Sequence, residues 1–407
     1  MLLLGGLFLL LPDLQAQNDE KFYTIRGEVK DMRTKKKIEY VTVSAVGTSV
    51  GTITNEDGEF VLKLSDTLSV SEIEFSCMGY YNTRVPVSIN NPKNQVFYLT
   101  SRTISLQEIE VLGWENSIKL LEAAIEKIDK NYSLTPNMLT GFYRETAQKG
   151  RKYINISEAV IGIYKDSYKE DFERDRVRIL KGRKLISPNR KDTLAVKLMG
   201  GPTLSTYLDI VKNPTVLLDK EVFAYYNYKP GETTSIDNRL QYVVHFSPKL
   251  LLPIPLYSGT FYIDQETLSF TRVEFELDMR DKEKVINFIL LHKPAGLRFS
   301  PEEVSYVVSY KQQNGKTYLN YIHNEIKFKC DWKRKLFATN YTIVSEMVIT
   351  DNQKENISKI PVKNSFTMRQ SLSEEAMTYY DSDFWGAYNI IEPTESLESA
   401  VGKLKKE

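Results

Sequence analysis

The sequence predicts a mainly β protein with two β units: a small N-terminal sandwich and a large antiparallel sheet with a packing helix. Among 407 residues there are 25 Tyr and 18 Phe, and aromatic side chains favour strands because they pack well on a pleated surface. Short alternating segments separated by turn residues recur through most of the chain. A chain of this length exceeds an ordinary single domain, so we expect at least two packed units.

Residues 22–100 predict the sandwich, because about seven short strands alternate there with turn residues. Phe22–Lys30 is the first of these strands. Asn55–Gly58 has the composition of a tight turn, in which Gly can take a positive φ. We expect this turn to join Gly51–Thr54 and Phe60–Leu62 as the two strands of a hairpin.

Residues 101–132 separate the two β units and contain the clearest helical repeat in the sequence. Within Asn116–Tyr132, apolar residues recur at steps of three and four, at Ile118, Leu121, Ala124, Ile125, Ile128 and Tyr132. One stripe of this helix should therefore face a core. We expect it to dock on the following sheet, with a partner-binding helix as the alternative.

Residues 133–407 predict the large sheet. Val304, Tyr306, Val308 and Tyr310 share one face of a strand, and Asn314-Gly315 is a strong hairpin turn signal before Tyr318–Cys330 returns in alternation. A second long hairpin turns at residues 264–267. Long antiparallel strands with one polar face imply a curved sheet whose concave side is covered by the helix or by loops.

The N-terminus predicts export. Met1–Leu11 is an apolar run, and the polar segment after it contains Leu14-Gln15-Ala16, which suits cleavage before Gln17. We therefore expect a signal peptide over residues 1–16, with a buried N-terminal strand as the alternative. No later apolar run is long enough to predict a transmembrane helix.

The charge balance and the cysteines limit the functional classes. The 54 Lys and Arg residues nearly cancel the 53 Asp and Glu residues, so no global field favours nucleic acid. Cys77 and Cys330 lie in apolar strand patterns of different regions. A single bridge and two buried free thiols both remain open.

A basic segment is the first candidate site. Residues 174–191 contain eight basic residues and one acid. If this segment is a strand, Arg174, Arg176 and Arg178 project from one face and could hold phosphate, sulfate or carboxylate groups in a row. The candidate anion-binding residues are Arg174, Arg176, Arg178, Lys181, Arg183 and Lys184. The alternative is a solvated strand face balanced by acids elsewhere.

An aromatic cluster near the C-terminus is the second candidate site. Phe384, Trp385 and Tyr388 lie within five residues of one another. They could form a stacking platform for sugar rings or an aromatic plug that closes the sheet.

The sequence predicts no catalytic residue, no metal ligand and no cofactor. The three histidines, His245, His292 and His323, lack the paired spacing with which zinc peptidases present two ligands. The sequence also contains no Gly-x-Ser-x-Gly elbow, no Ser-x-x-Lys motif and no P-loop. We therefore expect a protein that is not an enzyme.

The N-terminal unit carries a family resemblance. The pattern resembles the carboxypeptidase-regulatory-like domain in the following residues: Gly27-x-Val29-x-Asp31, Val41-x-Val43, Gly47-Thr48, Gly51-Thr52-x-Thr54-Asn55-x-Asp57-Gly58-x-Phe60 and Phe75-x-x-x-Gly79-Tyr80. The resemblance implies a transthyretin-like or Ig-like sandwich, of the kind found at the N-terminus of TonB-dependent outer-membrane receptors and related envelope proteins. It implies a folding and interaction module without peptidase activity.

The second region resembles the uncharacterised portion that follows this domain in a family of Gram-negative envelope proteins. The matching residues are Phe142-Tyr143-Arg144-Glu145, Ser157-Glu158-Ala159, Lys181-Gly182-Arg183-Lys184, Gly200-Gly201-Pro202 and Tyr257–Asp264. The stretch from Gly259 to Glu276 is also similar to strands of periplasmic lipoprotein-carrier folds. That likeness implies a half-open barrel that shelters acyl chains.

These observations together predict a non-enzymatic exported protein, a binding or scaffolding module at the periplasmic side of the outer membrane and peripheral to it. The expected partners are an envelope protein, a lipid or an acidic glycan, and not nucleic acid. The segment Arg174–Arg183 and the loop within residues 248–264 are the candidate contacts. A periplasmic lipid or lipoprotein carrier with an apolar cavity in the second region is one alternative. An envelope glycan hydrolase, which needs two converging carboxylates, is the other.

Overall fold

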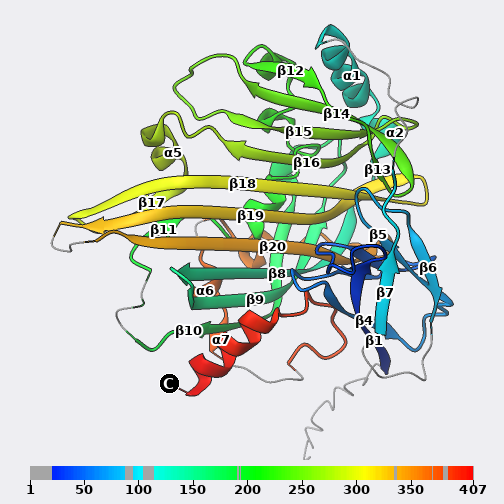
Figure 1. Cartoon of the computed structure of the whole chain (residues 1–407), viewed down its shortest axis with the longest axis horizontal. Helices are drawn as coiled ribbons and strands as arrows, with labels where there is room; N and C mark the ends of the chain where they lie inside the picture. Colours follow the sequence, from blue (N-terminus) through cyan, green and yellow to red (C-terminus); the bar gives the residue numbers. More distant parts are fainter. Residues whose placement is uncertain are drawn as a thin grey trace, which may run out of the picture.

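The computed structural model describes residues 21–87, 95–103, 114–189, 192, 194–333, 337–368, 370–378 and 384–406. The predicted signal peptide over residues 1–16 lies outside the described residues, as do residues 104–113 of the predicted linker. The described chain is mainly β, with a small sandwich against one end of a large curved sheet (Figure 1). Within the described ranges, no helix combines the length and the apolar character needed to cross a membrane.

The N-terminal unit contains the predicted seven strands, in two sheets of order β4-β1-β7 and β3-β2-β5-β6. Its core is apolar and aromatic: the ring of Phe75 lies 4.6 Å from that of Phe97 and 5.5 Å from that of Phe60. The strands are β1 (Phe22–Asp31), β2 (Thr42–Ala45), β3 (Gly51–Ile53), β4 (Glu59–Ser65), β5 (Glu72–Ser76), β6 (Thr83–Pro86) and β7 (Gln95–Leu99).

The hairpin predicted around Asn55–Gly58 is wrong, although the turn itself is present. Gly58 has a φ of 70°, and its N–H donates to the carbonyl of Asn55 at 2.9 Å. However, β3 pairs with β2, and β4 pairs with β1. The turn therefore carries the chain from one sheet of the sandwich to the other. A local turn signal does not specify which of these two connections the chain makes.

The large unit is a twelve-stranded sheet of order β12-β14-β15-β16-β18-β19-β20-β8-β9-β10-β21, with β13 also paired to β14. All neighbours are antiparallel except β10 and β21, which are parallel. The strands are β8 (Asn137–Lys149), β9 (Lys152–Lys165), β10 (Arg176–Ile186), β12 (Tyr226–Pro230), β13 (Thr234–Ile236), β14 (Arg239–Pro248), β15 (Tyr257–Asp264), β16 (Phe270–Leu277), β18 (Leu297–Gln313), β19 (Lys316–Trp332), β20 (Thr339–Gln353) and β21 (Met377–Thr378). A separate two-stranded sheet joins β11 (Lys197–Leu198) to β17 (Leu290–His292).

The central hairpin of the large sheet is as predicted. Asn314 and Gly315 take positive φ angles of 52° and 75° between β18 and β19. Val304, Tyr306, Val308 and Tyr310 are all buried on one face. We call this the inner face of the sheet, because it carries the larger hydrophobic core.

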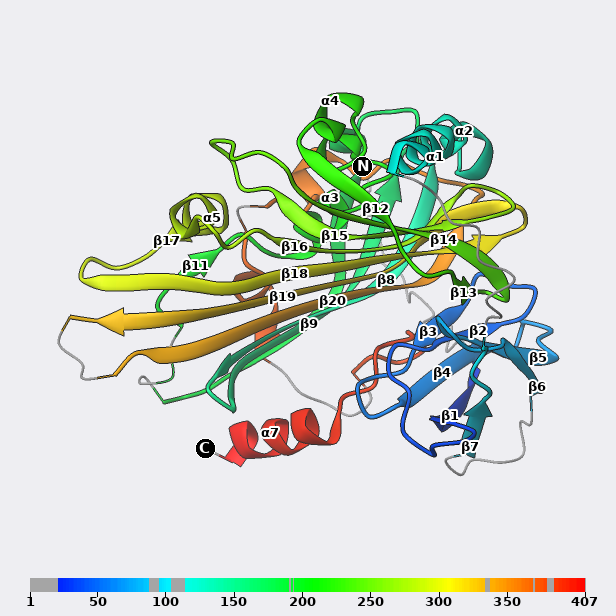
Figure 2. The ribbon, with the colours of Figure 1, turned by 45° about the horizontal axis from the view of Figure 1, so that its top comes forward.

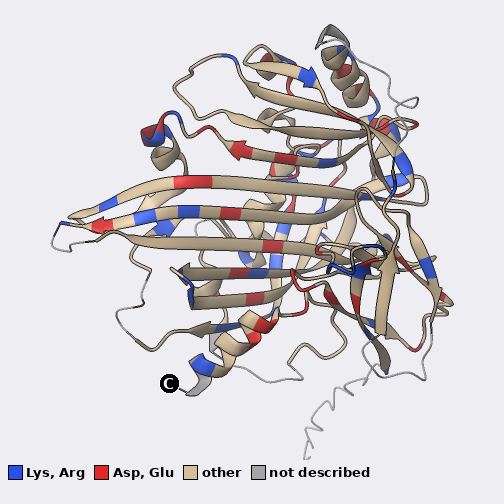
Figure 3. Cartoon of the chain, in the orientation of Figure 1, with Lys and Arg blue, Asp and Glu red and all other residues tan. Residues whose placement is uncertain are grey.

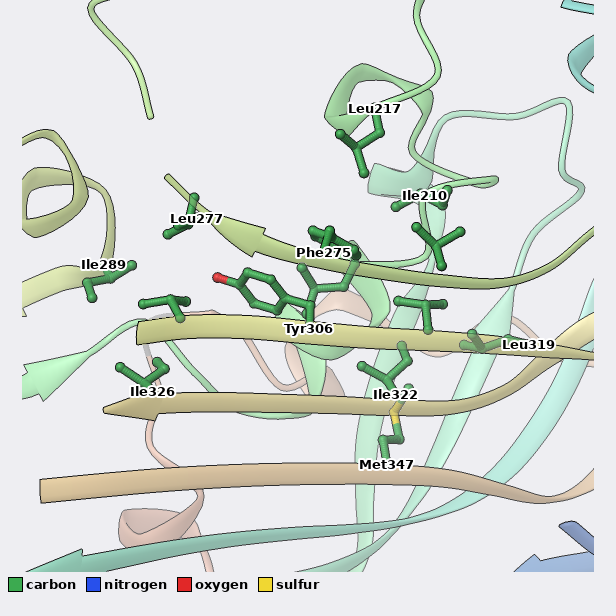
Figure 4. Packing of buried hydrophobic residues seen from close by; sticks show 14 of the residues in the cluster. Ile210, Leu217, Phe275, Leu277, Ile289, Tyr306, Leu319, Ile322, Ile326 and Met347 are labelled. Atoms are coloured by element: carbon green, nitrogen blue, oxygen red, sulfur yellow. The ribbon is translucent and has the colours of Figure 1, made fainter. Parts of the chain in front are cut away.

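Helices and loops cover the inner face on the side away from the sandwich (Figure 2). The predicted amphipathic helix is observed as α1 (Trp114–Glu126) with the short α2 (Ile128–Asn131), and Leu121 and Ala124 are buried in the core. Figure 4 shows Ile210 and Leu217 facing inner-face side chains of β16 to β20. The remaining helices are α3 (Pro202–Tyr207), α4 (Lys220–Phe223), α5 (Lys282–Ile289), α6 (Leu372–Glu375) and α7 (Glu395–Lys406), with 3-10 turns η2 (Phe172–Arg174), η4 (Pro214–Val216) and η5 (Val362–Asn364).

The sandwich packs on the opposite, outer face of the large sheet. Tyr40 of the sandwich stacks on Tyr321 of β19, with ring centroids 5.6 Å apart. Residues 384–394, which we call the C-terminal strap, also lie at this interface: the hydroxyl of Thr52 donates to the carbonyl of Ile390 at 2.9 Å. The sandwich, the strap and the sheet therefore share one apolar cluster.

Candidate functional site

The candidate site is a cavity of about 330 Å³ on the inner face, between the sheet and the segments that cover it. Its apolar lining comes from several strands, the short helix α6 and the loops around them, and includes Ile154, Val196, Leu198, Ile326, Ile343 and Leu372. This volume lies within the range of about 300 to 1,000 Å³ that is typical of ligand pockets, which are mostly apolar with a few placed polar groups.

Three polar side chains lie in one row across the base of this cavity, and we call Asn324, Ser345 and Glu145 the polar row. Asn324 on β19 is in register with Ser345 on β20. Ser345 is in turn in register with Glu145 on β8. All three residues line the cavity. Sheet pairing alone therefore brings together residues that are far apart in the sequence.

Hydrogen bonds fix the Glu145 end of the polar row. The hydroxyl of Tyr143, which is fully buried, donates to Oε2 of Glu145 at 3.0 Å. The loop at Gly200 lies against the same carboxyl group, because a Cβ added to Gly200 would be 3.5 Å from Oε2 of Glu145. Burial raises the pKa of Glu145, while the contacts from Tyr143 and Gly201 oppose that rise. The carboxyl group is thus held in a defined position in an environment that disfavours its charge.

Gly201 shapes the loop that covers this carboxyl group. Its φ of 86° is strained for any residue with a side chain, and an added Cβ would lie 2.9 Å from Cε1 of Phe366. Phe366 is held in place because its N–H donates to Val177 at 2.7 Å and its carbonyl accepts from the Thr203 hydroxyl at 2.7 Å. The loop can therefore approach Glu145 this closely only with Gly at position 201.

The mouth of the cavity is partly exposed. Ile186 and Leu291 line the cavity and are also exposed to solvent. Across the same rim, the Lys197 ammonium group lies 3.6 Å from Oε2 of Glu374, joining β11 to α6. Exposed pairs of this kind contribute little to stability, about 0 to 1 kcal/mol. This ion pair therefore stabilises the rim of the cavity less than the buried hydrogen bond between Tyr143 and Glu145 stabilises its base.

The basic candidates are placed differently from the prediction. Arg174 lies in η2 and not in the strand, because the Asp171 side chain caps that turn by accepting from Glu173 N–H at 2.9 Å. The predicted single strand face of three arginines is therefore wrong at Arg174, which instead pairs with Glu170 at 2.8 Å. Figure 3 shows basic and acidic residues interspersed over the sheet.

The other basic candidates lie on β10, where Arg176, Arg178, Lys181 and Arg183 belong to the outer face and Lys184 points to the inner face. A bulge between Ile179 and Lys181 shifts the register with β9. Arg178 is exposed, and Lys184 donates to the carbonyl of Ser373. Anion binding by the exposed members of this group stays a prediction.

Arg183 is buried in an ion cluster that sequence reasoning did not identify. Its Nε and one terminal nitrogen lie 2.6 Å from Oε2 of Glu158, and Nε of Arg144 lies 2.8 Å from Oε1 of the same carboxylate. Arg144 also donates to the carbonyl of Ile391 in the C-terminal strap at 2.7 Å. Burial tends to raise the pKa of Glu158, but the two guanidinium groups outweigh it and hold that pKa below its usual value.

The structure brings the aromatic candidates to this same cluster. Phe384 and Trp385 are 7% and 3% exposed and pack against Phe142 on the outer face. The Lys181 ammonium group lies 4.5 Å from the ring centroid of Phe384, and the Arg183 guanidinium lies 4.7 Å from that of Trp385. Tyr388 stays exposed. These positions favour the plug interpretation, because protein covers the first two rings.

The Pro-rich loop between β14 and β15, the other predicted contact, exposes apolar side chains. Leu250, Leu251 and Ile254 are all exposed there. Asp278 and Lys284, at the end of β16 and on α5, line the same shallow depression as this loop. A role for the loop as a contact surface stays a prediction.

Sequence reasoning missed the polar row, although a signal for it was present. Asn324 lies in phase with the buried Ile322 and Ile326, and Ser345 lies between Ile343 and Met347 in the same way. A polar residue in the apolar phase of a strand indicates either a buried hydrogen bond or a site. The sequence does not give the register that aligns these strands.

The N-terminal unit matches a known domain family. Residues 25–111 match the CarboxypepD_reg-like domain. The CarboxypepD_reg-like domain thus includes all of β2 to β7 and most of β1, about a fifth of the chain. It confirms the resemblance read from Gly27 to Tyr80. No curated protein matches the sequence.

Solved structures give only weak matches. A DUF1329 family protein from Desulfovibrio piger is 10% identical, with 59% of this chain and 94% of that chain covered and a TM-score of 0.24. A LolA superfamily protein from Nitrosomonas europaea is 12% identical, with 61% and 97% covered and a TM-score of 0.23. A membrane-associated protein of unknown function from Bacteroides fragilis is 12% identical, with 82% and 99% covered and a TM-score of 0.16. TM-scores this low identify neither a shared fold nor a shared function.

Proposed function

We propose that this chain is an exported, non-enzymatic binding protein that holds a small amphiphilic ligand in the inner-face cavity. The cavity itself carries the proposal. Its volume of about 330 Å³ equals that of roughly eleven water molecules at about 30 Å³ each. An apolar lining over a polar base suits a molecule with a hydrocarbon chain and one polar head group.

The carboxylates of the cavity support binding in preference to glycan hydrolysis. Glu145, Asp192 and Glu374 line it. Asp192, however, is paired with Lys149 and Lys152 at the end of the β8–β9 hairpin. Glu374 is likewise paired with Lys197, at 3.6 Å. Two of the three carboxylates are therefore already paired with lysines, whereas glycoside hydrolysis needs two carboxyl groups that act on the scissile bond.

The proposed location is the cell envelope, peripheral to the outer membrane on its periplasmic side. The apolar run Met1–Leu11 supports export. The CarboxypepD_reg-like domain supports an interaction role for the N-terminal unit, which packs on the outer face of the sheet, opposite the cavity. An envelope protein or a lipid is therefore the proposed partner, and the chain acts as a carrier or a ligand-dependent scaffold.

Native mass spectrometry of the chain purified from its own envelope in mild detergent tests this function. We expect a retained small-molecule mass that survives detergent exchange. Ile343→Trp, which fills the cavity from β20, should abolish it. Thr342→Trp is the matched control, because the neighbouring residue points to the outer face and does not line the cavity. A clean apo mass for the wild type, with no binding of an apolar dye, would refute the function.

A further inference from the structure

Three connections at one end of the large sheet carry exposed apolar side chains. They are residues 249–256 between β14 and β15, residues 278–296 between β16 and β18, and the connection from β19 to β20. Antiparallel pairing brings all three to the same end, because β14, β16 and β19 run toward it and β15, β18 and β20 run away from it. The sandwich lies at the other end, as Figures 1 and 2 show.

Contacts join these connections into one surface. The loop between β14 and β15 shares a shallow depression with Lys284 of α5. The Lys333 N–H donates to the carbonyl of Gly296 at 3.4 Å, which joins the end of β19 to the start of β18. We call the exposed apolar residues of this surface the apolar end, and they are Leu250, Leu251, Ile254, Phe288, Leu291 and Phe337.

The apolar end includes most of the strongly exposed apolar side chains. Scattered exposed apolar residues are normal, whereas a group of them marks an interaction site. Among the described residues, four large apolar side chains are at least 60% exposed, and three of these belong to the apolar end: Phe337 at 82%, Leu251 at 73% and Ile254 at 60%. The fourth, Val362 at 71%, lies elsewhere. This end of the sheet is therefore a candidate for contact with a partner.

The charge of this surface is positive, although the whole chain is nearly neutral. The described parts of the three connections hold six basic and three acidic residues. Two of the acids pair with neighbouring basic residues. Lys249, Lys282 and Lys333 are exposed and form no ion pair within the described residues. The apolar side chains are therefore interspersed with basic groups that are available to an anion.

We propose that the apolar end docks on an anionic lipid bilayer, with its apolar side chains between the head groups and its lysines beside the phosphates. Apolar side chains combined with Lys and Arg bind anionic membrane surfaces in this way. A bilayer fits better than a protein partner, because lipids rearrange around side chains that project from three separate connections. A protein would need a complementary surface for them.

The cavity opens at the apolar end. Leu291 belongs to the apolar end and also lines the mouth of the cavity. A docked protein would therefore place this mouth beside the bilayer, and an amphiphile would pass between the two without crossing water. This part of the inference rests on the proposed function and assigns the membrane as the source or the destination of its ligand.

Co-sedimentation of the full-length protein with lipid vesicles tests the docking surface. We expect the wild type to bind phosphatidylcholine vesicles that contain phosphatidylglycerol about tenfold more tightly than vesicles of phosphatidylcholine alone, since each lysine near the surface adds to the attraction. Leu251→Asp combined with Phe337→Asp should weaken binding to the anionic vesicles about tenfold or more, because the change removes two apolar anchors and adds two negative charges.

The matched control is Val362→Asp combined with Tyr81→Asp. It adds the same charge at exposed apolar positions away from the apolar end. Tyr81 lies in the sandwich, and Phe366, four residues after Val362, donates its N–H to Val177 near the start of β10, at the opposite end of the sheet. This variant should bind vesicles like the wild type. The basic residues at the start of β10 are unchanged in both variants, so they do not account for a difference between them.

Native mass spectrometry of the same variants separates this inference from the proposed function, because Leu251 and Phe337 do not line the cavity. Both variants should retain the small-molecule mass. If the wild type retains that mass but binds no vesicles, or if the two variants bind vesicles equally, the function stands and the docking surface is overturned. If vesicle binding follows the expected pattern and the wild type retains no small molecule, the docking surface stands and the proposed function fails. A dimer that only the Leu251→Asp, Phe337→Asp variant disrupts would assign the apolar end to a second copy of this chain and overturn the inference.

Discussion

Replacing Glu158 with Gln should destabilise the protein strongly, because this carboxylate neutralises two buried guanidinium groups. The side chains of Arg144, Glu158 and Arg183 are 4%, 4% and 6% exposed. The carboxylate oxygens take three contacts of 2.6 to 2.8 Å from the two arginines. Gln keeps the shape but removes the negative charge that both arginines contact, and its amide nitrogen cannot accept the hydrogen bonds that a carboxylate oxygen accepts there.

The expected loss of unfolding free energy is about 3 to 5 kcal/mol, the cost of breaking a buried pair by removing one partner. Urea unfolding followed by tryptophan fluorescence measures it, because Trp385 lies over Arg183 in the same cluster. Glu303→Gln is the matched control. Glu303 pairs with Lys327 at 3.1 Å, but both side chains are 40% exposed, so we expect a loss below about 1 kcal/mol.

The same cluster predicts a pH dependence. Because the folded protein holds the pKa of Glu158 below its usual value, the stabilisation is fully present above the unfolded pKa of about 4.3 and is lost as the pH falls through the folded pKa. The wild type should therefore lose stability below about pH 4 more steeply than Glu158→Gln. If Glu158→Gln and Glu303→Gln lose equal amounts of unfolding free energy at neutral pH, Glu158 does not stabilise the fold in this way.

Two further predictions concern the predicted anion site and the thiols. Replacing Arg174, Arg176 and Arg178 together with Ser should weaken binding to anionic lipid vesicles while the melting temperature changes little, because Arg174 is exposed and its shortest ion pair, at 2.8 Å, is to the exposed side chain of Glu170. Unchanged vesicle binding would eliminate this site. Cys77 and Cys330 are free, and burial raises the pKa of each thiol to about 11. Both should react slowly with iodoacetamide at pH 8 in the native protein and rapidly in urea, whereas an intact mass two hydrogens below that of the reduced chain would show a disulfide.

Local patterns predicted the parts of the fold that depend on local chemistry. The alternation from Val304 to Tyr310 and the Asn314-Gly315 turn identified the β18–β19 hairpin, because side-chain direction in a strand alternates residue by residue. The helical repeat around Leu121 identified α1, because residues three and four positions apart lie on one face of a helix. These features need no information about distant segments.

The polar row depends instead on pairing between distant strands. Glu145 lies next to Ser345 only because β8 pairs with β20, although about 200 residues separate them. The turn at Asn55–Gly58 shows the same limit on a smaller scale, since its two strands belong to different sheets. Register and partner choice come from burial across the whole domain.

The arginine prediction failed for a local reason that the sequence contained. Spacing by two is compatible with a strand, but Asp171 is a strong capping residue and stops the strand pattern before Arg176. Arg183 was also misjudged, because its counter-ion Glu158 comes from the neighbouring strand. A basic run gives the number of charges but does not show which of them are already neutralised.

The position of the C-terminal strap has a consequence for biosynthesis. Residues 384–394 fill part of the space between the sandwich and the sheet, with Asn389 exchanging hydrogen bonds with the backbone of Lys63 at 2.7 and 3.0 Å. The N-terminal unit emerges first from a ribosome or an export channel, yet a segment that emerges far later completes its interface. Until then, the strap does not bury its share of the surface of Ile53 and Tyr40. The nascent chain therefore exposes an apolar patch to solvent during most of its synthesis. A chain interrupted before the strap would keep that surface, which marks it for chaperones and proteases.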